Sequence, residues 1–414
     1  MIISSIDLMD GKTVQLRQGE KKMLEREDTF ALARNFDRYG KIAVIDLDAA
    51  MNKGNNAEMI KELLSRGECR VGGGVRTVEK ARELVSLGAE KVIIGSKAFE
   101  NDTINHAFLE KLTKEIGEYR LIIAIDALHN EIVTDAWKHT TGLDLYETVP
   151  FLEKYASEFL FTCVEREGTM KGIDMPMVKK LTEVTTRELT VAGGVSTMGE
   201  VAELSRLGVD AQLGMALYKE KIDLAEAFIE SLSWKSDLIP TITQNTSGQV
   251  LMLAYSSKES LKKAFETRKM WYFSRSRGKL WQKGESSGNT QKFIRMRADC
   301  DRDAVLTTVN QKGVACHTGS YSCFGDKHYG LHELHAVLRD RLEKKPQGSY
   351  TASLSDERLR EKILEEAQEV MEARTEDEVI WESADVMYFL TVLLAKHGIS
   401  VEDVLNELAR RRKK

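Results

Sequence analysis

Residues 299–323 hold the densest set of potential metal ligands in the chain, and read DCDRDAVLTTVNQKGVACHTGSYSC. If DCDRD is a strand, its side chains alternate, so that the three aspartates share one face and the first cysteine points to the other. Carboxylates are suitable ligands for Mg²⁺ and thiolates for Zn²⁺. The carboxylates are Asp299, Asp301 and Asp303, and the thiols are Cys300, Cys316 and Cys323.

Three thiolates leave one position of a tetrahedral zinc site open, as in catalytic rather than structural zinc sites. Zinc lowers the pKa of a bound water to about 7, so that hydroxide forms at neutral pH. The other interpretation is a charged hairpin with buried thiols. Because both ligand patterns coincide within one short segment, we predict a metal-dependent hydrolase.

A second acidic group lies near the C-terminus, in the stretches EEAQE and ESAD. Their carboxylates are three or four residues apart, a spacing that brings side chains together on one helix face. One aspartate lies inside the apolar run ADVMYFLTVLL, where an ionised carboxylate is costly unless it is paired or bound to metal. Solvated helix faces are the alternative. We predict a Mg²⁺ site between two helices, suited to a pyrophosphate-bearing substrate and formed by Glu365, Glu366, Glu369, Glu382 and Asp385.

Two further aspartates are related by an internal repeat. The segment VGGGVRTVEKARELVSLGAEKVIIGSKAF at 71–99 recurs as VAGGVSTMGEVAELSRLGVDAQLGMALY at 191–218, and SSIDLMDG at 4–11 recurs as IAIDALHN at 123–130. Apolar strand patterns alternate with helical ones throughout 1–231, so we expect two four-strand halves closing into a (β/α)₈ barrel. Asp7 and Asp126 then face each other across the barrel mouth as a paired general base and acid.

The same repeat predicts two phosphate sites. Barrel active sites lie at the carboxyl ends of the strands, and glycines there let backbone N–H groups approach an anion. One half supplies Gly73, Gly74, Arg76, Gly95 and Ser96, and the other supplies Gly193, Gly194, Ser196 and Gly214. Two sites half a barrel apart imply an elongated substrate with a phosphate at each end.

Basic and aromatic residues interleave between 268 and 283, including Arg275, Arg277, Trp281 and Lys283. This pattern is consistent with stacking on single-stranded nucleic acid, or with holding one purine nucleotide. A solvated basic face is the third interpretation. The net charge of −5 disfavours a dedicated nucleic-acid binder. No apolar run reaches the ~20 residues of a membrane span, and five unevenly spaced cysteines indicate a reducing cytoplasm.

The segment 1–231, which holds the repeat, resembles phosphoribosylformimino-aminoimidazole carboxamide ribotide isomerase of histidine biosynthesis. The matching motifs are SIDLMDGKTVQLRQGE, IDLDAA, VGGGVR, VIIGS, TCVEREGT and AGGVS. The resemblance implies an Amadori rearrangement of ProFAR to PRFAR, in which Asp126 opens the ribose ring as acid, Asp7 is the base at C2′ and Thr162 assists. The chain departs from the family at Gln15, Ala49 and Glu167, and we expect Arg17 to substitute for the arginine missing at position 15.

Two further resemblances follow along the chain. FSRSRGKLW, KGESSGN, DCDRD, ACHTG and SCF resemble phosphoribosyl-AMP cyclohydrolase, which implies opening of the adenine ring, a proton-carrying His317 and a homodimer sharing its zinc cysteines. GSYT, EEAQE and ESAD resemble phosphoribosyl-ATP pyrophosphatase of the all-helical nucleotide pyrophosphohydrolase class. That match adds Ser349 and Tyr350 as substrate contacts.

The sequence therefore predicts three domains: a TIM barrel isomerase at 1–231, a small β-rich α+β metal-binding cyclohydrolase at 232–327, and an all-α pyrophosphohydrolase at 328–414. We expect a cytoplasmic, trifunctional enzyme acting on phosphoribosyl nucleotides, dependent on Zn²⁺ and Mg²⁺ and dimeric through 232–414, with no nucleic-acid or membrane partner. The competing hypothesis is a nucleotide- or RNA-binding scaffold that has lost one or more activities.

Overall fold

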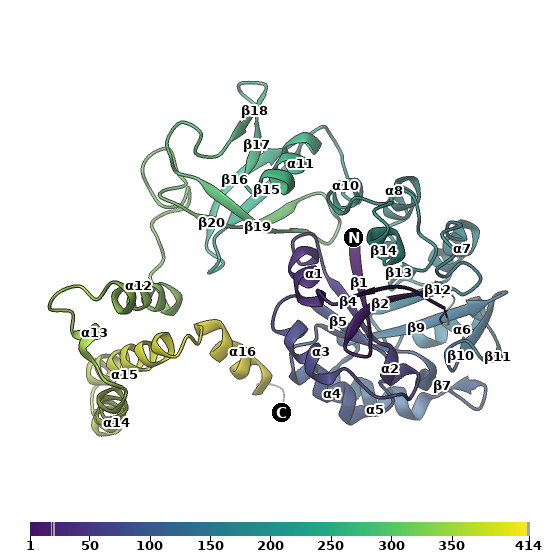
Figure 1. The fold of residues 1–414 in the computed structure, drawn as a ribbon, viewed down its shortest axis with the longest axis horizontal. Helices are drawn as coiled ribbons and strands as arrows, with labels where there is room; N and C mark the ends of the chain where they lie inside the picture. The colour runs from purple at the N-terminus through teal and green to yellow at the C-terminus, as the bar shows by residue number, and fades with distance from the viewer. Residues whose placement is uncertain (18, 20, 412–414) are drawn as a thin grey trace. The chain divides into compact units, whose positions relative to one another are not determined.

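The computed structural model describes residues 1–17, 19 and 21–411. These residues form two compact units, 1–319 and 320–414. The first unit contains a barrel followed by a small mixed sheet, and the second is helical (Figure 1). The expected domain boundaries at 231/232 and 327/328 stay predictions.

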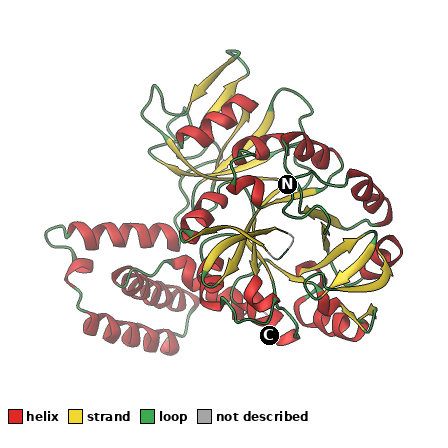
Figure 2. Ribbon diagram, turned by 45° about the vertical axis from the view of Figure 1, so that its right-hand side comes forward, coloured by secondary structure: helices red, strands yellow, loops and turns green. Residues whose placement is uncertain are grey.

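Eight parallel strands close the barrel, which confirms the predicted fold class. In order around the barrel they are β1 (Ile2–Met9), β4 (Ile42–Asp46), β5 (Cys69–Gly72), β6 (Lys91–Ile94), β9 (Leu121–Leu128), β12 (Glu158–Cys163), β13 (Glu188–Ala192) and β14 (Asp210–Leu213). The pairing of β14 with β1 completes the ring. Helices surround these strands, as the red outer layer of Figure 2 shows.

The internal repeat is visible in the topology. In the first half, β1 is followed by an antiparallel hairpin of β2 (Lys12–Arg17) and β3 (Lys21–Arg26). In the second half, β9 is followed by β10 (Glu131–Thr134) and β11 (His139–Asp144) in the same arrangement. Each half therefore begins with a long strand whose hairpin extends beyond its carboxyl end.

Apolar side chains of the strands and of the surrounding helices form one large core. The longer helices are α1 (Thr29–Phe36), α3 (Ala57–Leu64), α4 (Val78–Ser86), α5 (His106–Ile116), α6 (Leu145–Leu152), α7 (Met175–Val184), α8 (Met198–Arg206) and α10 (Leu224–Glu230). Thr77 and Thr197, which are related by the repeat, both cap a helix N-terminus with the side-chain oxygen, satisfying an otherwise unpaired N–H. The shorter elements are α2 (Leu47–Ala50), η1 (Ser96–Ala98), β7 (Phe99–Glu100), β8 (Thr103–Ile104), η2 (Glu118–Arg120) and α9 (Met215–Tyr218).

A buried ionic layer crosses the barrel interior near the amino ends of the strands. The Arg70 guanidinium pairs with the Glu158 carboxylate, and both side chains are almost fully buried. Lys91 Nζ lies 2.9 Å from Glu158 and 2.9 Å from Glu188, and Thr190 Oγ1 donates to Glu158 at 2.6 Å. Because a buried charge needs a partner, this network closes one end of the barrel with matched charges.

The sheet after the barrel has the strand order β16 (Val250–Ser256), β15 (Ile239–Gln244), β20 (Val305–Gln311) and β19 (Gln291–Ala298). Helix α11 (Lys258–Thr267) and the hairpin of β17 (Trp271–Ser274) and β18 (Lys279–Gln282) lie between β16 and β19 in the chain. This confirms the β-rich middle region.

The second unit consists of α12 (Leu331–Lys344), α13 (Tyr350–Ser353), α14 (Asp356–Glu372), α15 (Glu376–Lys396) and α16 (Val401–Arg411). Its core includes Leu338, Leu359, Phe389 and Val392. The side chains of Ser355 and Thr375 cap the N-termini of α14 and α15. In the part of the chain that the structure describes, no helix combines the length and apolar character needed to cross a bilayer.

Candidate active site

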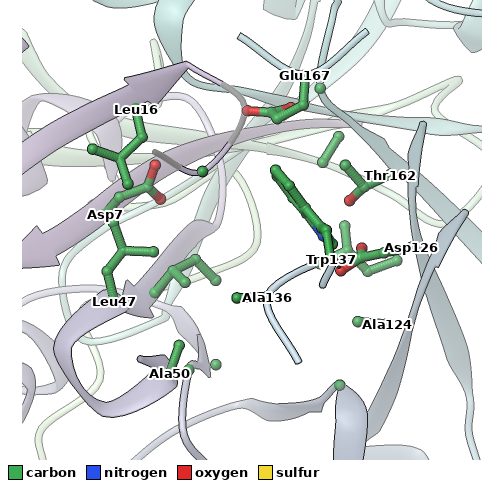
Figure 3. A pocket seen from close by; sticks show the side chains of 18 of the residues that line it. Asp7, Leu16, Leu47, Ala50, Ala124, Asp126, Ala136, Trp137, Thr162 and Glu167 are labelled. Atoms are coloured by element: carbon green, nitrogen blue, oxygen red, sulfur yellow. Dashed lines mark hydrogen bonds between the residues drawn. The ribbon is translucent and has the colours of Figure 1, made fainter. Parts of the chain in front are cut away.

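A cavity of about 730 Å³ opens at the carboxyl ends of the barrel strands. Asp7 and Asp126 project into it from opposite sides, with Trp137 and Glu167 also facing the cavity (Figure 3). The structure thus brings together both halves of the repeat. The predicted residues among its lining are Asp7, Gly73, Gly74, Arg76, Gly95, Ser96, Asp126, Thr162, Gly193, Gly194 and Gly214.

Asp7 lies on β1 close to the carboxyl end of the strand. Its Oδ1 accepts a hydrogen bond from Ser5 Oγ at 2.7 Å, and its Oδ2 accepts one from Gln15 Nε2 at 2.9 Å. Burial raises the pKa of Asp7 to about 6, and these two hydrogen bonds limit the rise. At neutral pH the carboxylate is therefore mostly ionised, but is more basic than an exposed aspartate, as a general base requires.

Asp126 is the counterpart of Asp7 on β9, where Thr162 of β12 pairs beside it. Its Oδ2 accepts a hydrogen bond from the indole Nε1 of Trp137 at 2.8 Å. Burial raises the pKa of Asp126, while the hydrogen bonds from Trp137 and Thr162 oppose that shift. A raised pKa favours the protonated form that a general acid must present.

Glu167 supplies a third carboxyl group to the same cavity. Burial, together with the nearby charges of Asp7 and Asp126, raises its pKa to about 8. A β-carbon at Gly193 would lie 2.1 Å from Glu167 Oε2, and Gly193 has a φ of +77°. Only glycine therefore leaves room for this carboxyl group beside the loop after β13.

The predicted phosphate loops occupy corresponding places in the two halves. Gly95 precedes η1 and Gly214 precedes α9, each directly after a barrel strand. In the first half, the Ser96 hydroxyl accepts a hydrogen bond from the backbone N–H of Asp135 at 2.8 Å. The Arg76 guanidinium donates to two carbonyl groups of α2, at 2.8 and 2.7 Å.

Two predicted ligands are not among the described residues that line the cavity, namely Arg17 and Ser196. Ser196 Oγ instead bonds to Glu200 Oε2 at 3.1 Å, next to the cap of α8. Arg17 is the last residue of β2, beyond the part of the strand that faces the cavity. Gln15 lines the cavity and Arg17 is exposed.

Sequence reasoning missed Trp137 and the direct bond between Gln15 and Asp7. Trp137 follows Asp135 and Ala136 in a turn where all three residues have positive φ angles, between 53° and 69°. Non-glycine residues seldom adopt this conformation, so nothing in their types signals it. The repeat was the available signal, because it places a hairpin after β9 where one follows β1.

The three aspartates of DCDRD do converge, but the strand expected there is wrong. Strand β19 ends at Ala298, and a turn follows in which Ala304 N donates to Asp299 Oδ1 at 3.1 Å and Arg302 has a φ of 64°. The side-chain oxygens of Asp299, Asp301 and Asp303 lie within 4.8 Å of one another. A donor set of three clustered carboxylates fits a hard divalent cation such as Mg²⁺.

The thiols of the predicted zinc site take part in no disulfide bond in the part of the chain that the structure describes. Cys300 belongs to the same turn as the aspartates, and Cys316 lies near the end of the first unit with its Sγ 3.0 Å from Thr318 Oγ1. Neighbouring His317 is exposed. Cys323 belongs to the second unit and is exposed.

Basic side chains of the β17–β18 hairpin lie over aromatic rings of the hairpin itself and of β16. The Arg275 guanidinium lies 3.8 Å from the ring centroid of Tyr255, and that of Arg277 lies 5.9 Å from Trp281. Lys283 Nζ donates to the carbonyl of Ala315 at 2.8 Å, which ties the hairpin to the cysteine-bearing segment. This arrangement is suited to binding a flat, anionic nucleotide.

In the helical unit, carboxyl groups of α14 and α15 meet. Oxygens of Glu366, Glu382 and Asp385 lie within 4.8 Å of one another. Burial raises the pKa of Glu369, with further contributions from Glu382 and Glu366. Crowded carboxylates of this kind fit a divalent cation, which removes their mutual repulsion.

Other predicted members of the helical site lie around this cluster. Glu365 is exposed and pairs with Lys362 at 2.9 Å, and the same lysine lies 2.6 Å from Glu366. Ser349 caps α13, and the exposed ring of Tyr350 packs edge-on against Phe389. The three residues Glu366, Glu382 and Asp385 therefore form the centre of the candidate site.

Three family models match the chain in succession. One described as histidine biosynthesis protein matches residues 1–223, which is more than half of the chain. Those described as phosphoribosyl-AMP cyclohydrolase and phosphoribosyl-ATP pyrophosphohydrolase match residues 252–325 and 331–412. Each segment contains one of the carboxylate clusters described above.

Similar proteins divide into two groups. An imidazole-4-carboxamide isomerase of Methanocaldococcus jannaschii is 37% identical over 234 residues, which are 55% of this chain and 97% of the relative. The histidine biosynthesis bifunctional protein HisIE of Pyrococcus furiosus is 42% identical, over 45% of this chain and 99% of the relative. The HisIE protein of Bacillus subtilis is 45% identical, over 42% of this chain and 91% of the relative. The chain belongs to the histidine biosynthesis protein family, and its isomerase-type barrel is followed by phosphoribosyl-AMP cyclohydrolase and phosphoribosyl-ATP pyrophosphohydrolase domains.

Proposed function

We propose that the chain performs three consecutive reactions of histidine biosynthesis. Its helical domain hydrolyses phosphoribosyl-ATP to phosphoribosyl-AMP and pyrophosphate, its middle domain opens the adenine ring to give ProFAR, and its barrel isomerises ProFAR to PRFAR. The observation that carries this proposal is that each matched segment retains its own cluster of acidic side chains, converging around the barrel cavity or within 4.8 Å of one another.

In the barrel, the proposed isomerisation uses Asp126 as acid and Asp7 as base. Asp126 protonates the ribose ring oxygen as the ring opens to an imine, and Asp7 then removes the C2′ proton to give the enolamine that becomes the ketose. Trp137 and Thr162 hold Asp126 through hydrogen bonds, and Gln15 holds Asp7. The raised pKa of Glu167, about 8, keeps that carboxyl group protonated at neutral pH, so that it adds no negative charge beside the Asp7 carboxylate.

The arrangement of the glycine loops supports the same assignment. Loops after strands of opposite halves place Gly73, Gly95, Gly193 and Gly214 around one cavity. Backbone N–H groups at such glycines can approach phosphate oxygens closely. A substrate with one phosphate at each end would span the cavity and place its sugar between Asp7 and Asp126.

In the middle domain, Asp299, Asp301 and Asp303 would hold Mg²⁺, and Cys300, Cys316 and Cys323 would hold Zn²⁺. Zinc, when bound, supplies hydroxide at neutral pH for attack on the adenine ring. His317, adjacent to Cys316, would carry the proton. Arg275, Arg277, Trp281 and Lys283 would bind the nucleotide, and these thiols fit a reducing, cytoplasmic setting.

In the helical domain, Glu366, Glu382 and Asp385 would hold Mg²⁺ against the pyrophosphate, with Glu365 and Glu369 beside them. The divalent ion, when bound, neutralises the phosphate charge that develops as pyrophosphate leaves. Ser349 and Tyr350 would contact the nucleotide.

We also propose that the chain forms a homodimer through 232–414. Helices α14 and α15 expose several large apolar side chains to solvent, including Leu364 at 73%, Met371 at 86%, Ile380 at 67% and Trp381 at 71%. Apolar groups of this size, repeated along two helices, indicate a covered face. Light scattering should give twice the chain mass for the parent protein. The double variant Ile380→Glu with Trp381→Glu should have one chain mass. A monomeric parent protein would contradict the dimer.

The reaction order gives a direct test. Purified protein incubated with phosphoribosyl-ATP, Mg²⁺ and Zn²⁺ should form PRFAR. Mass spectrometry identifies the products that accumulate. Glu366→Gln should stop at phosphoribosyl-ATP, Cys316→Ser at phosphoribosyl-AMP, and Asp126→Asn at ProFAR. A parent protein that binds the nucleotides without turnover would instead support a scaffold, and a variant that passes its expected block would refute that residue's role.

A further inference from the structure

The small mixed sheet with α11, which follows the barrel in the first unit, packs on the amino-terminal end of the barrel. Phe265 of α11 lies 4.7 Å from the ring of Tyr39 and 5.5 Å from that of Phe228, measured between centroids, and 5.3 Å from Phe293 of β19. Phe228, Phe265 and Phe293 are each only 3% exposed. Aromatic side chains from both sides therefore form a shared, dry cluster.

Arg297 of β19 adds a polar anchor beside this cluster. Its guanidinium donates to Asp37 Oδ1 at 2.6 Å, to the Asp37 carbonyl at 2.6 Å and to Glu68 Oε2 at 3.1 Å. Burial opposes ionisation of Glu68, but Arg297 outweighs this effect and the pKa of Glu68 lies below its ordinary value. Such multiple charge-assisted bonds fix orientation as well as contact.

Arg302 makes the second anchor, from within the acidic turn. Its guanidinium donates to Asp210 Oδ1 at 2.5 Å, to the Gly208 carbonyl at 3.0 Å and to the Val209 carbonyl at 3.4 Å. The backbone of Arg302 has a φ of 64°, a conformation that costs free energy in a residue with a side chain. The bonds to the barrel offset this cost and hold the turn.

Both anchors reach the end of the barrel opposite to the cavity. Asp210 is the first residue of β14, and Glu68 directly precedes β5. Asp7 and Asp126 lie near the carboxyl ends of β1 and β9. The docked domain therefore leaves the isomerase cavity uncovered and uses the end of the barrel that carries no proposed chemistry.

We propose that the amino-terminal end of the barrel is a docking surface for the cyclohydrolase domain, which it binds without help from the covalent connection. We further infer that Arg302 acts as a positioning residue, through which the barrel holds Asp299, Asp301 and Asp303 in place to bind a divalent cation. The second statement rests on the proposed function of the acidic turn, and the first does not.

The docking is tested by cutting the connection after folding. A protease recognition sequence inserted between Ser236 and Asp237, both exposed, allows cleavage of the purified chain. The two products should co-elute at micromolar concentration, whereas those of Arg297→Glu with Arg302→Glu should separate. Lys312→Glu, a charge reversal at an exposed lysine on the same domain, should leave co-elution intact.

Separation of the parent fragments would overturn the docking proposal, as would co-elution of the double variant. If the double variant does not fold, the milder Arg302→Gln is used, and its fragments should dissociate at a concentration at least tenfold higher than the parent's. An unchanged dissociation concentration for Arg302→Gln would equally overturn the proposal.

The positioning role is tested with Mn²⁺ as probe, in the uncleaved chain carrying Glu366→Gln to weaken the helical site. Arg302→Gln should weaken Mn²⁺ binding about tenfold, measured by electron paramagnetic resonance, with an unchanged far-ultraviolet circular dichroism spectrum. Unchanged Mn²⁺ affinity would overturn the positioning role. If Asp301→Asn also leaves binding unchanged, the proposed metal role of the turn fails, while the docking result stands independently.

Discussion

Buried acidic side chains lie at both ends of the barrel, but the pKa is raised at one end and lowered at the other. At the carboxyl end, Asp7, Asp126 and Glu167 face a cavity, and burial raises the pKa of each. At the amino end, Glu158 is also deeply buried, but Arg70 and Lys91 outweigh burial and lower its pKa. The difference is the presence of a partner guanidinium or ammonium group, not the depth of burial.

This contrast separates stability from chemistry within one fold. Paired carboxylates lock strands together and dock the neighbouring domain, as Arg297 and Arg302 show. Among the described residues, the carboxyl groups at the cavity have no such cationic partner, and the pKa of each stays raised, as groups that exchange protons with a substrate require. Their arrangement is expected to reduce stability, as functional sites often do.

Glu158→Gln should produce the largest effect on stability. It leaves the buried Arg70 and Lys91 without their main counter-charge, and breaking a buried pair typically costs about 3–5 kcal/mol. Urea denaturation should show a lowered free energy of unfolding, with isomerisation per folded molecule retained. A variant as stable as the parent would show that the paired end contributes little.

Asp126→Asn should produce the largest effect on chemistry. The amide keeps the shape and the bond from Trp137, but it cannot donate the proton, so isomerisation should fall by at least ~10². Initial rates with ProFAR give the comparison. Retention of near-normal activity would mean that this carboxyl group is only structural.

Glu167→Gln should change the pH dependence of stability. The folded state keeps the Glu167 proton up to about pH 8, whereas the unfolded chain releases it near its ordinary value of 4.5, so the parent loses stability as pH rises between these limits. One pKa unit corresponds to about 1.4 kcal/mol, so we expect the amide to stabilise the protein by ~1–3 kcal/mol at pH 8 and negligibly at pH 4.

The control for Glu167 is Glu165→Gln, two residues earlier, because the pKa of Glu165 is lowered rather than raised. This variant should lose rather than gain stability as pH rises. Parallel unfolding profiles for the two variants would contradict the assignment of the shift to Glu167.

Glu188→Gln should produce the smallest effect. This carboxylate contacts the same Lys91 as Glu158 does, but its side chain is 67% exposed, and exposed pairs contribute about 0–1 kcal/mol. Comparing the losses in free energy of unfolding of Glu188→Gln and Glu158→Gln separates the effect of burial from the effect of the contact with Lys91. Equal losses in the two variants would show that burial does not decide the effect.

The repeat made much of this architecture predictable from sequence. The constant offset between SSIDLMDG and IAIDALHN placed Asp7 and Asp126 on equivalent strands, and the glycine loops followed from it. Alternation failed where the backbone is irregular, in the turn that follows Ala298 at the end of β19. Such irregularities depend on tertiary contacts, and strand periodicity carries no information about them.

Long-range partners were equally hidden. Arg302 stands among aspartates in the sequence, yet its guanidinium bonds to Asp210, 92 residues away. Trp137 reaches Asp126 only because three consecutive residues adopt positive φ angles. Residue type indicated the chemistry of the site, whereas the packing of distant segments decided which side chains support it.

The most direct test measures isomerisation and unfolding on the same preparations of Asp126→Asn and Glu158→Gln. We predict opposite outcomes: Asp126→Asn loses at least ~10² in isomerisation without loss of stability, and Glu158→Gln loses stability while its folded fraction keeps near-parental isomerisation. If both variants lose activity and stability together, or if Glu158→Gln alone abolishes the reaction in folded protein, the division of the barrel into a chemical end and a structural end is wrong.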